Sequence, residues 1–249
     1  MKIALKGLVL RETKYKEADK ILTVLTSDRG CISLRARGVL RKNSRIAPGC
    51  QLFTYTEFTV FSAAGIAMVD EADPMEMFLG LRQDLKKLAL AAYIADVLCQ
   101  LSDEDSANGA LLRLALNSFY ALSALSHPAE LVRGAFEFRA MVESGFAPDL
   151  SACSVCHNEP EGALLHLTSG VLTCLSCRRS TPEMNAGIAL PCSPEVLALL
   201  RYFAGAPLSR LLSVSYDPKV LPDLVGVTES YMATQMEKSF ATLDYYKSL

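Results

Sequence analysis

Four of the eight cysteines occur as two Cys-x-x-Cys pairs, Cys153 with Cys156 and Cys174 with Cys177. Two thiolates at this spacing can turn toward one ion, and a second pair completes a tetrahedron of sulfurs about 2.3 Å from Zn²⁺. Because four bound thiolates leave no open position for water, we predict a structural Zn²⁺ site rather than a catalytic one. The site would form a zinc knuckle over residues 150–180.

Other chemistry remains open for these thiols. Four thiolates could hold an iron–sulfur cluster, pair as disulfides or stay metal-free. His157 and His166 lie inside the knuckle and could replace a cysteine as ligands, but we interpret them as surface polar residues. The remaining cysteines have apolar neighbours and are interpreted as buried thiols; they are Cys31, Cys50, Cys99 and Cys192.

A second chemical feature is a group of cations near the N-terminus. Residues 1–50 hold twelve Lys or Arg against four Asp or Glu, whereas the rest of the chain is acidic. Five cations fall within eleven positions: Arg35, Arg37, Arg41, Lys42 and Arg45. Such a surface can follow a phosphate backbone. A solvated edge strand that uses charge to prevent aggregation would look similar, so that alternative stays open.

The first 75 residues read as short strands separated by turn signals, which predicts a small barrel. The expected strands are Ile3–Arg11, Lys20–Thr26, Cys31–Gly38, Gln51–Phe61 and Ile66–Asp70. Five strands fit the oligonucleotide-binding (OB) type of barrel. Arg35 and Arg37 would then project from one face, because side chains in a strand alternate.

Helical spacing replaces the strand pattern after Pro74. We expect a helix capped by Asp84 that ends near Leu101, and a capped helix that begins at Ser193. Further helices are expected near 110–125, after Pro128 and over 221–246. The predicted fold class is therefore α+β, with an OB-fold domain over residues 1–78 and a helical domain over 79–249 that contains the inserted zinc knuckle.

Composition excludes several classes of protein. Hydrophobic residues make up 51% of the chain, which argues against disorder. The N-terminus lacks a secretory hydrophobic region, and the longest apolar stretch, Leu88–Leu101, is too short for a membrane span and contains Asp96. We expect a cytoplasmic protein with no membrane partner.

The N-terminal residues resemble the signature of the bacterial RecO family. The resemblance is carried by the run Tyr15–Thr26, by Gly30 and by the run Arg37–Arg45. It implies a recombination mediator that acts in DNA repair after DNA damage, built from an OB-fold barrel and a helical domain with a four-cysteine zinc motif. The length and order of the predicted elements agree with it over the whole chain.

By resemblance, the chain would bind single- and double-stranded DNA and anneal complementary strands. Its implied partners are RecR and the acidic C-terminal tail of the single-stranded-DNA-binding protein, with a functional link to the RecA recombinase. The implied DNA contacts are Arg35, Arg37, Arg41, Lys42 and Arg45, followed by Lys14, Lys16 and Lys20. The family's Gly-Ala-Arg appears here as Gly38-Val39-Leu40, and the cations resume at Arg41.

The acidic tail would need a hydrophobic pocket beside a cation on the helical domain, and Arg133 and Arg139 are the candidates. The sequence does not discriminate between them.

The main alternative is a zinc-containing enzyme that processes nucleic acid. Asp70-Glu71 or Asp103-Glu104-Asp105 could hold Mg²⁺, but a strand end and a solvated loop explain these acids more simply. The sequence contains no phosphate-binding loop ending in Gly-Lys-Ser or Gly-Lys-Thr, and His127 is the one histidine outside the knuckle. We therefore expect a protein that is not an enzyme. A protein-binding transcription adaptor is a third hypothesis.

Overall fold

The computed structural model describes residues 2–61, 65–104, 106–180 and 187–249. Its contacts divide the chain into two compact units, residues 1–126 together with 240–249, and residues 127–239. This division differs from the expected boundary after residue 78, because the first two long helices group with the barrel. Each unit is described by itself.

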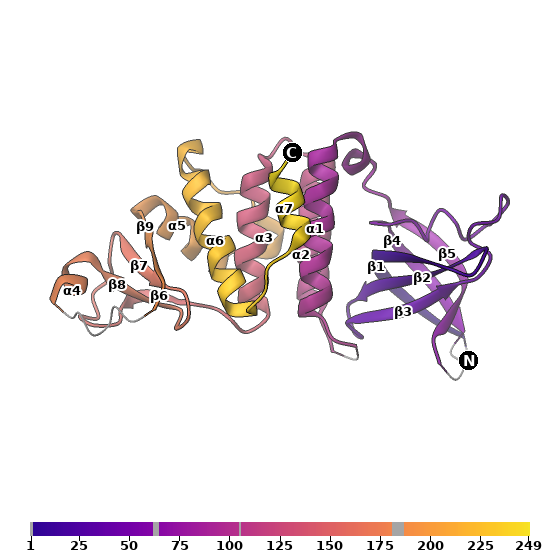
Figure 1. Cartoon of the computed structure of the whole chain (residues 1–249), viewed down its shortest axis with the longest axis horizontal. Helices are drawn as coiled ribbons and strands as arrows, with labels where there is room; N and C mark the ends of the chain where they lie inside the picture. The colour runs from indigo at the N-terminus through magenta and orange to yellow at the C-terminus, as the bar shows by residue number, and fades with distance from the viewer. Residues whose placement is uncertain (1, 62–64, 105, 181–186) are drawn as a thin grey trace. The chain divides into compact units, whose positions relative to one another are not determined.

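The first unit contains a closed barrel in the strand order β1-β2-β3-β5-β4 (Figure 1). Its strands are β1 (Lys2–Tyr15), β2 (Asp19–Thr26), β3 (Cys31–Ala36), β4 (Tyr55–Phe61) and β5 (Ala67–Glu76). All neighbours are antiparallel except β3 and β5. The five strands confirm the predicted OB-fold barrel.

The long strand β1 closes the barrel because its first half pairs with β4 and its second half with β2. Gly7 pairs with both neighbours, at Thr26 and at Thr56. A Cβ atom at this position would lie 2.4 Å from Cγ1 of Val24, so only glycine allows the close approach. Alternating side chains such as Leu22, Leu34 and Phe58 are fully buried and fill the interior.

β5 extends further than the sequence predicted. We expected it to end at Asp70, before Pro74, but pairing with β4 continues as far as Glu76 opposite Tyr55. The register shifts between Tyr55 and Thr56, next to the pairing of Thr56 with Pro74. Proline is tolerated in a strand at such an irregularity.

Three α-helices complete the first unit: α1 (Leu85–Leu101), α2 (Gly109–Ala124) and α7 (Ala241–Lys247). A short 3₁₀ helix, η1 (Leu79–Gln83), precedes α1. Asp84 caps α1 as predicted, and its side chain accepts hydrogen bonds from the amides of Lys86 and Lys87. The ring of Phe119 in α2 packs edge-on against Phe53 and Phe78, with centroids 5.2 and 5.7 Å apart.

The expected final helix over residues 221–246 is wrong, because the chain breaks it into α6 (Leu221–Met236) and α7. Glu237 adopts a left-handed conformation with φ of 49° and Phe240 is extended. The buried Phe240 ring then packs against Tyr93 of α1, with centroids 5.6 Å apart. An apolar stripe at helical spacing does not reveal such a break, since both pieces bury their apolar residues.

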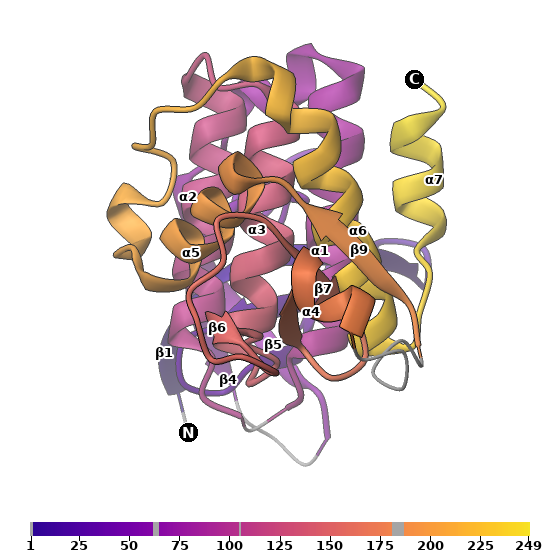
Figure 2. The same cartoon turned by 90° about the vertical axis from the view of Figure 1, so that its left-hand side faces the viewer.

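The second unit combines helices with a four-stranded sheet in the order β6-β8-β7-β9. Figure 2 labels β6, β7 and β9 of this sheet. Its α-helices are α3 (Ala129–Glu143), α4 (Leu175–Ser180), α5 (Pro194–Gly205) and α6, and the 3₁₀ turns η3 (Leu208–Arg210) and η4 (Pro218–Val220) follow α5. Its strands are β6 (Asp149–Cys153), β7 (Ala163–His166), β8 (Val171–Cys174) and β9 (Ala189–Cys192). Ser193 caps α5 as predicted.

Buried charges join α3 to α6. Arg133 contacts the carboxylates of Glu137 at 3.0 Å and Glu229 at 2.6 Å. The second oxygen of Glu137 accepts a 2.6 Å hydrogen bond from the hydroxyl of Thr228. The Glu137 side chain is fully buried, so these contacts replace the water that its charge would otherwise need.

We predict that Glu137→Ala lowers the free energy of unfolding by about 3 kcal/mol, because it leaves the buried Arg133 with one carboxylate fewer. Urea denaturation followed by circular dichroism measures this change. Glu137→Gln keeps the shape and the acceptor for Thr228, so its loss should be smaller. Equal stability of the alanine variant and the unaltered chain would contradict a structural role for this charge cluster.

Candidate metal centre and nucleic-acid interface

The four paired cysteines converge at one end of the sheet in the second unit. Cys153 ends β6, Cys174 ends β8, Cys177 lies in α4, and Cys156 follows β6 in a turn. All four sulfurs lie within 4.8 Å of one another. The pairs meet because β6 lies beside β8, with Cys153 opposite Leu172 and the Ser154 amide 2.8 Å from the Leu172 carbonyl; β7 and β8 form a hairpin, from Ala163 opposite Cys174 to Leu165 opposite Leu172.

The cluster fits a tetrahedral metal ion. Sulfurs about 2.3 Å from a tetrahedral Zn²⁺ lie about 3.8 Å apart, and the sulfurs of Cys156 and Cys174 are 3.9 Å apart. Backbone amides also donate to the sulfurs, at 3.3 Å from Cys174 to Cys153 and at 3.5 Å from Cys177 to Cys174. Amide donors of this kind orient thiolate ligands and stabilise their charge.

The thiols of the cluster differ in their affinity for protons. The hydroxyl of Ser176 and the amide of Cys177 lower the pKa of Cys174 to about 6. The Cys177 thiol interacts with the Cys174 sulfur, which raises the pKa of Cys177 to about 12. Adjacent thiolates repel one another, and a bound cation would remove this repulsion. The donor set therefore suits a divalent metal bound by four thiolates.

One sequence prediction about the knuckle is wrong. His166 is not a surface residue, because it is buried and its Nε2 lies 3.0 Å from the hydroxyl of Thr173 across the β7–β8 pair. His157 is exposed, as expected, in a left-handed turn with φ of 59°.

The other cysteines only partly match the prediction of buried thiols. Cys50 and Cys192 are buried, and burial raises their pKa values to about 12 and about 11. Cys31 and Cys99 are half-buried, and their thiols interact with each other.

The candidate nucleic-acid interface is organised by a carboxylate that sequence inspection did not single out. Asp19 is buried at the start of β2 and accepts hydrogen bonds from Arg35 at 2.7 and 3.1 Å. Its other oxygen accepts a 2.8 Å bond from the amide of Gly38. The Gly38 amide and the Arg35 guanidinium hold the pKa of Asp19 below its ordinary value, so the carboxylate stays charged at neutral pH.

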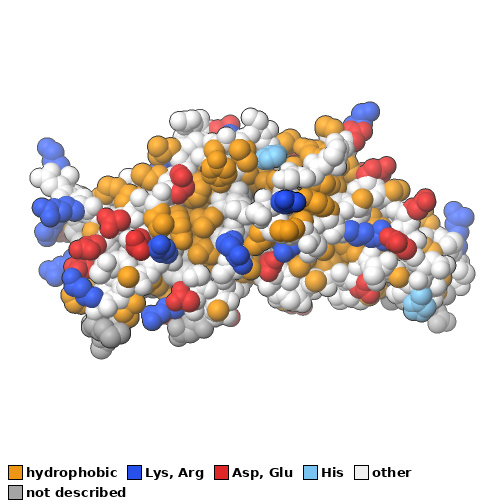
Figure 3. All heavy atoms as spheres, turned by 180° about the vertical axis from the view of Figure 1, so that it is seen from behind, with side chains coloured by type: hydrophobic (Ala, Val, Ile, Leu, Met, Phe, Trp, Pro, Cys, Tyr) orange, Lys and Arg blue, Asp and Glu red, His pale blue; other side chains and the backbone are white. Residues whose placement is uncertain are grey.

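This carboxylate fixes the loop that follows β3. The Leu40 amide bonds the carbonyl of Ala18 at 3.0 Å, and the Arg41 amide bonds the carbonyl of Gly38 at 3.1 Å. The loop is therefore tied to the β1–β2 hairpin. Figure 3 views the molecule from behind and shows Lys and Arg side chains gathered at the left, over the barrel.

The structure separates the eight predicted DNA-contacting residues into two groups. Arg35 is engaged by Asp19, and Lys20 forms a 2.8 Å ion pair with Glu12. In the described part of the chain, the other six are exposed and have no carboxylate within ion-pair distance. These six, called here the free cations, are Lys14, Lys16, Arg37, Arg41, Lys42 and Arg45.

The side chains of Lys20 and Arg35 also lie on opposite faces of the barrel sheet. It pairs with Ala36, whereas its neighbour Ile21 pairs with Arg35. Directly paired residues share a face of the sheet, so Lys20 lies on the same side as the interior residues Leu22 and Leu34. Alternation along β2 could have indicated this, because Leu22 and Val24 are apolar.

Neither of the arginines expected to bind the acidic tail, Arg133 and Arg139, is available to a ligand. Arg133 belongs to the buried charge cluster described above. Arg139 contacts Glu143 at 2.7 Å and donates to the carbonyls of Phe203, Ala204 and Ala206 at 2.9–3.0 Å. Both arginines therefore hold helices of the second unit together.

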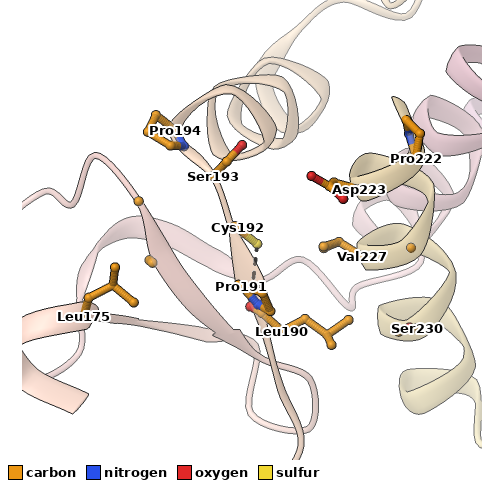
Figure 4. Close-up of a pocket in the computed structure, with 13 residues that line it drawn as sticks. Leu175, Leu190, Pro191, Cys192, Ser193, Pro194, Pro222, Asp223, Val227 and Ser230 are labelled. Carbon is orange, nitrogen blue, oxygen red and sulfur yellow. Dashed lines mark hydrogen bonds between the residues drawn. The ribbon is translucent and has the colours of Figure 1, made fainter. Parts of the chain in front are cut away.

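A cavity of about 570 Å³ in the second unit lies between β9, α5 and α6. Figure 4 shows the Asp223 carboxylate extending from α6 toward the side of the pocket that holds Ser193 and Cys192. Among the described residues that line it, none is Lys, Arg or His. An apolar pocket with an added negative charge does not suit an acidic ligand.

An apolar groove with nearby cations lies in the first unit, with a volume of about 470 Å³. It is lined by Leu52, Phe53, Leu85, Leu88, Ala89, Ala92, Ala241, Thr242 and Tyr245. Lys86 and Lys87 follow Leu85 directly; Lys86 is exposed and Lys87 is half-buried.

No helix among the described residues is long and apolar enough to cross a membrane.

Together, the closed barrel, the helices and the four-thiolate cluster define an OB-fold protein with a helical, cysteine-containing second part. Two family models match the chain: "Recombination protein O N terminal" over residues 1–78 and "Recombination protein O C terminal" over residues 82–244. The chain belongs to the RecO family of DNA repair proteins.

Curated relatives agree with this assignment, and each is named "DNA repair protein RecO". The relative from Acetivibrio thermocellus is 33% identical over 98% of this chain and 95% of its own length. Those from Rubrobacter xylanophilus and Bacillus pumilus are 32% and 30% identical, over 84% and 93% of this chain and 83% and 88% of their own lengths.

We predict that the purified chain binds one Zn²⁺ and that Cys174→Ser loses it, with a fall in melting temperature of several degrees. Metal analysis and thermal unfolding measure the two effects. Cys192→Ala is the matched control, because Cys192 lies outside the cluster and its loss should leave the metal bound. DNA affinity below the melting transition should change less than about twofold; a folded Cys174→Ser variant that no longer binds DNA would contradict a purely structural site.

Proposed function

We propose that this chain is a non-catalytic recombination mediator that binds single- and double-stranded DNA. Its basic N-terminal region, residues 1–78, would contact DNA, and residues 79–249 would supply the helical part with the zinc knuckle at 150–180. Membership of the RecO family supports this role. The observation that carries it is the set of free cations on the barrel hairpin and on the loop held by Asp19.

The mechanism needs only charge and proximity. Cations on one rigid surface replace the counterions of the phosphate backbone, so binding releases these ions and weakens as salt rises. Two complementary strands that are held close, with their charge screened, can pair spontaneously. Annealing of this kind consumes no nucleotide, and we propose that Zn²⁺ serves only to hold the knuckle.

Together with RecR, the chain would help RecA load onto DNA coated by the single-stranded-DNA-binding protein. We propose that the groove of the first unit receives the acidic tail of that protein. Its apolar wall can hold hydrophobic side chains, and Lys86 and Lys87 can attract carboxylates. With DNA as its target, the protein would act in the bacterial cytoplasm, on the nucleoid when it is bound.

The alternative of a zinc-containing nucleic-acid-processing enzyme has less support. Asp70 forms a 2.6 Å ion pair with Lys2, so this carboxylate is already engaged. Glu104 forms an isolated antiparallel β-bridge with Gly30, so the Asp103-Glu104 loop has a structural role in the first unit. Asp105 lies outside the described residues. Magnesium-dependent turnover of an oligonucleotide would favour the enzyme.

We predict that changing Arg37, Arg41, Lys42 and Arg45 to alanine weakens DNA binding at least a hundredfold at physiological salt, and flattens the slope of log affinity against log salt by up to about four. Fluorescence anisotropy at several salt concentrations measures both. A matched control changes four cations of the second unit: Arg178, Arg179, Arg210 and Lys219. Unchanged affinity in the first variant would overturn the proposed interface.

We predict that Lys86→Glu together with Lys87→Glu weakens binding of the acidic tail peptide at least tenfold, because the new carboxylates repel it. Anisotropy of a labelled tail peptide measures the affinity. Lys219→Glu tests whether a reversed charge elsewhere has the same effect. If the double variant binds the peptide as well as the unaltered chain does, the groove is not the tail site.

A further inference from the structure

Tyr15 is an aromatic residue exposed in the middle of the basic surface. It ends β1 at the tip of the β1–β2 hairpin, and 40% of its surface is exposed. The next residue, Lys16, has a left-handed conformation with φ of 55°, which turns the chain immediately beyond the ring. Packing in the barrel interior therefore does not account for an aromatic side chain at this position.

The ring is held by the same contacts that organise the loop. Tyr15 pairs directly with Asp19 in the β1–β2 register. The guanidinium of Arg35, which Asp19 fixes, lies over the ring at 5.1 Å from its centroid. This cation–π contact holds the phenol ring against a cation that cannot move freely.

A second cation lies over the same ring without being fixed. The ammonium of Lys16 is 5.5 Å from the Tyr15 centroid. Lys16 is exposed and is one of the free cations, so it can leave the ring and pair with a phosphate instead. The movement would uncover aromatic surface at the moment that a charged backbone arrives.

Accordingly, we propose that Tyr15 is a stacking platform for one unpaired base and makes this surface prefer single-stranded over double-stranded DNA. The inference rests on the proposed DNA-binding function and assigns it a specificity-determining residue. Phosphate contacts from the free cations do not distinguish the two forms, because both carry phosphates. In a duplex each base is covered by its neighbours, so only a single strand can place a base against the ring.

The absence of tryptophan from the sequence makes a direct test possible. Tyr15→Trp introduces a single indole whose fluorescence reports on stacking. Titration with an oligothymidylate should quench it strongly, whereas an abasic oligonucleotide of the same length and charge should quench it little at the same salt. Equal quenching by both would overturn the proposal, because charge alone would then explain the signal.

Affinity measurements give an independent test. Tyr15→Leu should weaken binding of the oligothymidylate roughly tenfold, the scale of one lost aromatic–base stack, and change duplex binding less than about twofold. The slope of log affinity against log salt should be unchanged, because no cation is removed. Tyr15→Phe keeps the ring and should bind like the unaltered chain.

Tyr120→Leu is the matched control, since Tyr120 lies in α2 and is also about half exposed. A Tyr15→Leu variant that binds both DNA forms as tightly as the unaltered chain, or loses both equally, would overturn the stacking proposal alone. If the unaltered chain binds neither form, the DNA-binding function fails as well. Thermal unfolding of each variant shows whether the hairpin is intact.

Discussion

The carboxylate of Asp19 connects three segments of the barrel that the candidate interface requires. It binds the guanidinium of Arg35 on β3 and the amide of Gly38 in the following loop. Asp19 itself begins β2 and pairs with Tyr15, the last residue of β1, across the β1–β2 hairpin. A charge buried in this way needs several donors, and it receives them from groups that are distant in sequence. Because the donors converge on one residue, hairpin and loop keep a fixed geometry, and the cations beyond them remain free.

The second unit depends on a different kind of constraint. Its sheet is built from strands of four or five residues, which bury little apolar surface on their own. The cysteine cluster holds the end of β6, the end of β8 and the start of α4 together. A metal ion held by these four ligands would replace part of the stability that a larger core would supply, because it would bind the folded arrangement and not the unfolded chain.

Local patterns predicted much of the fold. Helix starts with a capping side chain, at Asp84 and Ser193, were correct because the cap is a contact within a few residues. The break between α6 and α7 was missed, because the left-handed Glu237 precedes a ring that packs on the distant Tyr93. The burial of His166 was missed for a similar reason, since its partner Thr173 becomes a neighbour only when the hairpin forms.

The sequence by itself determined the chemistry available to this protein: the four cysteines at ligand spacing, the excess of cations near the N-terminus, the order of strands and helices, and the family. These properties follow from residue types and short spacings, which do not depend on the rest of the fold. Only the tertiary structure decided which cations are engaged and which are free. Arg35 and Arg37 look equivalent in sequence, but a carboxylate sixteen residues away engages the first, because ion pairs form between neighbours in space.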